Sequence, residues 1–121
     1  MKNIQASGTE NLFTDNVVKF SGGYGVYLSG VYGEISGNTF TGNNFEGNSK
    51  SSGGTSTTSI KLCTKYGNKV TGNKFEGNTF VGDATPKINQ CSSSTPTSPC
   101  FGNIYTANSP NDFKTDDSCL D

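Results

Sequence analysis

The chain lacks histidine and tryptophan, and it lacks arginine as well, because all nine of its basic residues are lysine. Histidine is the usual general base of nucleophilic catalysis and a frequent zinc ligand. Its absence excludes a Ser-His-Asp or Cys-His catalytic arrangement and any zinc site that depends on imidazole. The ten acidic residues are scattered, whereas cleavage of a glycosidic bond needs two facing carboxyl groups about 5 to 9 Å apart. The composition therefore favours a protein that is not an enzyme.

Strong charge and long apolar runs are missing too. The net charge is −1 and the isoelectric point is about 5.3, so the dispersed lysines offer no patch for a phosphate backbone and we predict no nucleic-acid partner. No apolar stretch approaches the roughly 20 residues of a membrane-spanning helix, so we predict no membrane span. The four cysteines are 28, 9 and 19 residues apart, unlike the close pairs of zinc sites. We predict no metal and no cofactor.

A repeated phrase, Asn-x-aromatic-x-x-Asn, is the clearest feature that is present. It occurs four times, at separations of 27, 35 and 30 residues. Repeats of this length are typical of units that bury their apolar faces only by stacking on their neighbours. The four copies are Asn11–Asn16, Asn38–Asn43, Asn73–Asn78 and Asn103–Asn108.

Upstream of three copies lies a second repeated segment, in which apolar and polar residues alternate: Val26–Ser29, Ile60–Cys63 and Ile88–Cys91. This period of two indicates half-buried strands. Sixteen glycines and four prolines punctuate the chain, and no window has helical spacing of apolar residues. We therefore predict an all-β parallel solenoid of about four coils over residues 1–108, followed by a capping tail over residues 109–121.

In such a solenoid, equivalent residues of successive coils lie about 4.8 Å apart, one above the other. Asparagine suits recurring turns, and stacked amides bond to one another in ladders. We interpret the repeated asparagines as structural, with a row of ligand-binding amides as the alternative. The predicted structural ladder has two columns. The amide column comprises Asn38, Asn73 and Asn103, and the ring column comprises Phe40, Phe75 and Tyr105.

The stretch from Gly25 to Asn43 resembles the right-handed parallel β-helix repeat of the pectin-lyase-like superfamily. The Phe-x-x-Asn motifs that begin at Phe13, Phe40, Phe45 and Phe75 are similar to repeats of polymorphic outer membrane proteins. The resemblance implies a right-handed parallel β-helix. It implies no single activity, because the superfamily includes lyases, hydrolases, epimerases and adhesins. Enzymes of the superfamily would be expected to carry a Gly-His-Gly motif or calcium-binding carboxylates beside a basic residue.

The cysteines indicate the compartment. Four cysteines in a chain so poor in apolar residues favour disulfides and hence a secreted or cell-surface location. The repeat alignment places Cys63 and Cys91 in one column, which favours a Cys63–Cys91 bond and leaves Cys100 for Cys119. A Cys91–Cys100 bond with a Cys63–Cys119 bond is the second arrangement, and four reduced thiols are the third.

Two classes of function remain. The first is a non-catalytic extracellular module with a structural, surface-display or adhesive role, including glycan binding through Tyr24, Tyr27, Tyr32 and Tyr66. The second is a fragment of a carbohydrate-active enzyme, such as a polysaccharide lyase, hydrolase or epimerase, whose catalytic coils lie outside this chain. Because no N-terminal cap is evident, we expect upstream coils of a longer solenoid, or another copy of the chain, to cover the N-terminal face.

Overall fold

A computed structural model describes residues 4–6, 8–19, 23–30, 33–48, 58–64, 68–82, 88–91 and 100–116. In these residues the chain is all β, with parallel strand pairing and no α-helix, as predicted. The strands are only two to four residues long and belong to four sheets, which we call A to D.

Sheet A has five strands: β1 (Ile4–Ala6), β5 (Val26–Ser29), β9 (Ile60–Cys63), β13 (Ile88–Cys91) and β16 (Phe113–Asp116). Sheet B has four: β2 (Gly8–Thr9), β6 (Ile35–Ser36), β10 (Val70–Thr71) and β14 (Cys100–Phe101). Sheet C has four: β3 (Leu12–Thr14), β7 (Thr39–Thr41), β11 (Lys74–Glu76) and β15 (Ile104–Thr106). Sheet D has three: β4 (Val17–Lys19), β8 (Asn44–Glu46) and β12 (Thr79–Val81).

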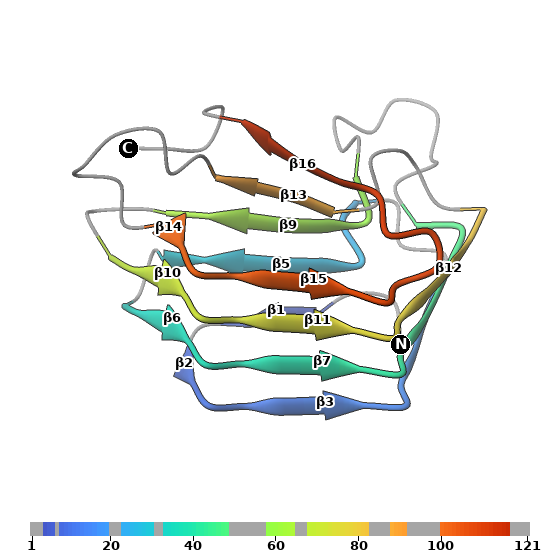
Figure 1. The fold of residues 1–121 in the computed structure, drawn as a ribbon, viewed down its shortest axis with the longest axis horizontal. Coiled ribbons are helices and arrows are strands. Elements are labelled where there is room, and N and C mark those ends of the chain that lie inside the picture. Colours follow the sequence, from blue (N-terminus) through green and yellow to red (C-terminus); the bar gives the residue numbers. More distant parts are fainter. Residues whose placement is uncertain are drawn as a thin grey trace.

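The chain passes through sheets A, B, C and D in that order three times, and each passage forms one layer of the molecule (Figure 1). The fourth passage supplies β13, β14 and β15, and Ser109 then bridges to Thr79 where a strand of sheet D would follow. The chain next enters sheet A again as β16, so a strand occupies part of the predicted tail.

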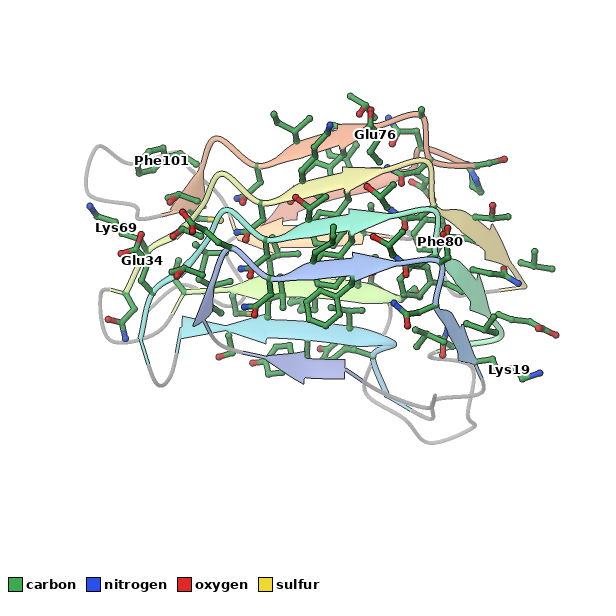
Figure 2. All side chains as sticks on the ribbon, turned by 90° about the horizontal axis from the view of Figure 1, so that it is seen from below. Lys19, Glu34, Lys69, Glu76, Phe80 and Phe101 are labelled. Atoms are coloured by element: carbon green, nitrogen blue, oxygen red, sulfur yellow. The ribbon has the colours of Figure 1, made fainter. Side chains whose placement is uncertain are left out.

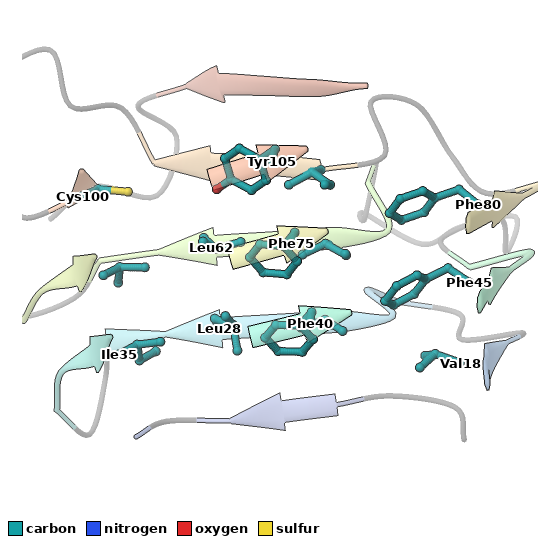
Figure 3. Packing of buried hydrophobic residues seen from close by; sticks show 14 residues of the cluster. Val18, Leu28, Ile35, Phe40, Phe45, Leu62, Phe75, Phe80, Cys100 and Tyr105 are labelled. Carbon is teal, nitrogen blue, oxygen red and sulfur yellow. The ribbon is translucent and has the colours of Figure 1, made fainter. Parts of the chain in front are cut away.

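The interior between the sheets is filled by side chains that repeat from layer to layer (Figure 3). Phe40 pairs in register with Phe13 on one side and with Phe75 on the other, and Phe75 pairs with Tyr105. The successive ring centroids are 4.5, 4.7 and 5.5 Å apart. Other sheets add parallel columns: Val26, Ile60 and Ile88 from sheet A; Ile35, Val70 and Cys100 from sheet B; and Val18, Phe45 and Phe80 from sheet D.

Left-handed backbone joins the sheets. The residue before each asparagine of the four repeated phrases has a positive φ, for example 66° at Gly77 and 53° at Ala107. Glycine adopts this conformation without steric cost, whereas a residue with a Cβ atom is strained there. These two positions are equivalent in neighbouring layers, because each directly follows the last residue of a sheet C strand, and those last residues, Glu76 and Thr106, pair in register.

Exchanging the residues of this column should change stability in opposite directions. We expect Gly77→Ala to cost about 1 kcal/mol, because a Cβ atom there meets nothing within 4 Å and only backbone strain is added. We expect Ala107→Gly to stabilise the protein by several tenths of a kcal/mol for the converse reason. Urea unfolding of both variants would check this, and a neutral Gly77→Ala variant would contradict it.

Candidate functional site

Charged side chains of the described residues lie on the outer faces of the sheets. Glu34 and Lys69 lie near each other in adjacent layers, whereas Lys19 and Glu76 lie apart from them (Figure 2). Glu76 stands in register between Thr41 and Thr106 and forms an ion pair with Lys74, at 2.5 Å. Among described residues, no three His, Cys, Asp or Glu side chains gather in a way that could hold a metal ion.

Tyr105 belongs to the interior rather than to a reactive site. Desolvation by burial raises the pKa of its hydroxyl far above the ordinary value. Its ring lies between Phe75 and Phe113, whose centroids are 5.5 and 5.0 Å away. The raised pKa therefore reflects core packing, and the hydroxyl stays neutral.

The repeated asparagines form two hydrogen-bonded ladders. In the first, the Nδ2 group of Asn38 donates to Oδ1 of Asn73 at 2.9 Å, and Nδ2 of Asn73 donates to Oδ1 of Asn103 at 2.9 Å. Each amide also donates to a backbone carbonyl of the preceding layer, as Asn73 does to Ile35 at 3.1 Å. The second ladder runs through Asn16, Asn43, Asn78, Asn108 and Asn111. Because the amides bond along the stack, they serve the fold and do not present a row to a ligand.

The structure describes two of the four tyrosines that were predicted to contact glycans. Tyr24 and Tyr27 are half-buried, and their rings stack at 5.3 Å with an interplanar angle of 21°. Tyr27 lies on the outer face of sheet A, because the alternate residues Val26 and Leu28 face the core. Tyr32 and Tyr66 lie outside the described residues.

Sequence reasoning missed two neighbours of this tyrosine pair. Lys61 pairs in register with Tyr27, and its side chain is only 7% exposed. Ser29 projects from the same face two residues after Tyr27, and its buried hydroxyl has no hydrogen-bond partner. The signal was available, since the column that aligns Val26 with Ile60 also aligns Tyr27 with Lys61. We call Tyr24, Tyr27, Ser29 and Lys61 the tyrosine surface.

The cysteines fall in two places. Cys63 ends β9 and Cys100 begins β14; both are buried and disulfide-bonded, and the described part of the chain holds no free cysteine. Leu62 pairs with Gln90, so Cys63 and Cys91 occupy the next positions along neighbouring strands. Cys119 and the side chain of Cys91 lie outside what the structure describes. The pairing therefore stays a prediction.

No helix in the described residues has the length and hydropathy to cross a membrane. Comparison of the chain with protein-family models, with curated proteins and with solved structures finds no match. The geometry described above is thus the basis for assigning a function.

Proposed function

We propose that the chain is a right-handed parallel β-helix module of the kind that its repeats resemble. The repeated passage through sheets A to D in one order, with every pairing parallel, supports this architecture. Right-handedness is the expected sense, because crossover connections between parallel strands are right-handed in about 98% of cases.

We further propose that this module is not an enzyme and acts outside the cell as a rigid structural, display or adhesive element. The observation that carries this proposal is the use of its repeated side chains. The aromatic rings stack and the amides form hydrogen bonds along the stack, so the repeated side chains stiffen the fold. The disulfide-bonded state of Cys63 and Cys100 supports an oxidising compartment.

For adhesion we propose the tyrosine surface as the contact with glycans. A tyrosine ring offers an apolar face on which the C–H groups of a sugar ring can pack, together with a hydroxyl that forms hydrogen bonds. Tyr24 and Tyr27 supply two such rings in fixed relation. Lys61 and Ser29 lie on the same face but are buried, so the two rings are the groups that a glycan would contact.

A glycan-array screen of the whole chain tests this role. We expect binding to at least one glycan class, and we expect Tyr27→Ser to weaken it about tenfold, as loss of one aromatic contact would. Phe101→Ser is the matched control, because Phe101 is an exposed ring on sheet B and is 55% exposed. Equal loss in both variants would contradict the assignment of the tyrosine surface.

The same preparation should be incubated with neutral and acidic polysaccharides. The proposal of a non-catalytic module expects no shortening of the polymers and no new unsaturated products. Turnover by this chain alone would overturn that proposal. Binding without turnover would agree with it.

A further inference from the structure

The rings of Tyr24 and Tyr27 cover one another. Their centroids are 5.3 Å apart, with an interplanar angle of 21°. Two rings lying edge to edge in one plane would clash at this separation, so the pair is stacked with an offset. One face of the Tyr27 ring is therefore covered by Tyr24. The pair offers a ligand a single ring face at a time, and not a flat platform two rings wide.

The neighbours of Tyr27 along the chain do not extend this contact. Alternate residues of a strand share a face, so Ser29 follows Tyr27 on the outer face of sheet A. Ser29 is only 6% exposed. In the other direction Gly25 carries no side chain and is buried. A ligand that extends along β5 thus meets no second aromatic ring at these positions.

The neighbours across the sheet are not aromatic either. Gln5 of β1 and Lys61 of β9 pair in register with Tyr27 from its two sides. Asn89 and Lys114 follow in register beyond Lys61. Tyr27 is the one aromatic residue of this column, and Lys61 beside it is only 7% exposed. The described strands of sheet A therefore provide one ring here and no row of rings for successive units of a polymer.

We propose that the tyrosine surface holds one sugar ring at the end of a glycan and does not hold a run of sugars within a polymer. Only part of the Tyr27 ring is accessible, while Ser29 and Lys61 around it are covered. A sugar inside a polymer carries a neighbour at each end, and both neighbours would lie over covered positions without gaining an aromatic contact. A terminal sugar has one neighbour, which can point away from the protein.

This inference rests on the proposed glycan-binding role and narrows it to one class of ligand, namely glycans that are short or are branched with accessible ends. One sugar ring is a small ligand with few atoms to contact. We therefore expect a Kd of about 1 mM or weaker for one chain and one glycan. Firmer attachment requires many copies of the chain that bind many glycan ends at once.

Binding of the whole chain to oligosaccharides of increasing length tests the inference. The probes are soluble oligosaccharides of one to six glucose, galactose or mannose units, together with the same lengths of the class that binds best on the array. Changes in NMR chemical shift give the Kd. In a series that binds, we expect the Kd, counted per glycan molecule, to change by less than about threefold from one sugar to six.

Tyr27→Ser should raise the Kd about tenfold for the shortest and the longest member alike, because both use the same ring. Phe101→Ser, at an exposed ring on β14, should leave both values unchanged. Thermal unfolding checks that each variant is folded.

The outcomes separate the inference from the role on which it rests. A Kd that falls by about tenfold or more with length would overturn the single-ring inference and leave glycan binding in place. Binding on the array with none in any of the series would do the same. No binding on the array or in solution would overturn both.

Discussion

Replacing Phe75 by alanine is expected to lower the free energy of unfolding by about 3 to 5 kcal/mol. The side chain is fully buried, and its ring stacks on Phe40 at 4.7 Å and on Tyr105 at 5.5 Å. Truncation removes apolar surface from the middle of a column and leaves a cavity between two rings that strand pairing holds in place. Neighbouring layers cannot move together to fill it without breaking their own ladders.

Urea unfolding followed by circular dichroism measures this effect. Phe75→Leu keeps most of the volume and should cost less than half as much as alanine. Phe101→Ala is the surface control, since Phe101 faces outward on β14 and its truncation should cost less than about 1 kcal/mol. If Phe75→Ala were no more harmful than Phe101→Ala, the ring stack would not be a main source of stability.

Repeat spacing made much of this fold predictable. Because equivalent residues of stacked layers must coincide, the intervals of 27, 35 and 30 residues were enough to align Phe13, Phe40, Phe75 and Tyr105, and the register agrees with that alignment. The alternation in Val26–Ser29 likewise predicted a strand, and β5 has the same bounds. The place of such a residue in the fold is determined by the equivalent residue of the adjacent layer, and the repeat shows which residue that is.

A shorter period was overlooked. Ile35, Phe40 and Phe45 are five residues apart and each belongs to a different sheet, as do Val70, Phe75 and Phe80. Each group of five residues contains one short strand and a turn that ends in asparagine, so the chain bends every five residues rather than once or twice a repeat. The column of Ile35 and Val70 also explains why Cys100 is buried: it occupies the inward position of the next layer.

The tyrosine surface was only partly predictable, for a physical reason. Outward side chains are not constrained by stacking, so the repeat pattern does not say which of them become covered. The placement of Tyr24 against Tyr27 and the burial of Lys61 are therefore properties of the folded structure that the repeat does not encode.

Replacing Asn78 by alanine is expected to cost about 3 to 6 kcal/mol, although it removes only a small amide. Its Oδ1 accepts from the backbone N–H and the Nδ2 of Asn43 at 2.9 and 3.0 Å, and its Nδ2 donates to the carbonyl of Phe40 and to Oδ1 of Asn108, both at 2.9 Å. Alanine removes all four bonds, and it takes from the buried backbone N–H of Asn43 its Oδ1 acceptor, whereas Nδ2 of Asn43 keeps the carbonyl of Phe13 and Oδ1 of Asn108 keeps the backbone N–H of residue 78. Asn44→Ala is the control, because the Oδ1 atom of Asn44 has no partner to lose, and it should cost less than about 1 kcal/mol.

Combining Asn78→Ala with Asn43→Ala distinguishes a ladder from a set of independent bonds. Each single variant already removes the contact between the two amides, so the double variant should cost about 1 to 2 kcal/mol less than the two single losses added together. Asn11→Ala combined with Asn78→Ala should be additive, because Asn11 belongs to the first ladder, bonds to Asn38 and shares no amide partner with Asn78. Additivity in the first pair would mean that the amides act separately, and it would remove the ladder as a reason for the stiffness that a display module requires.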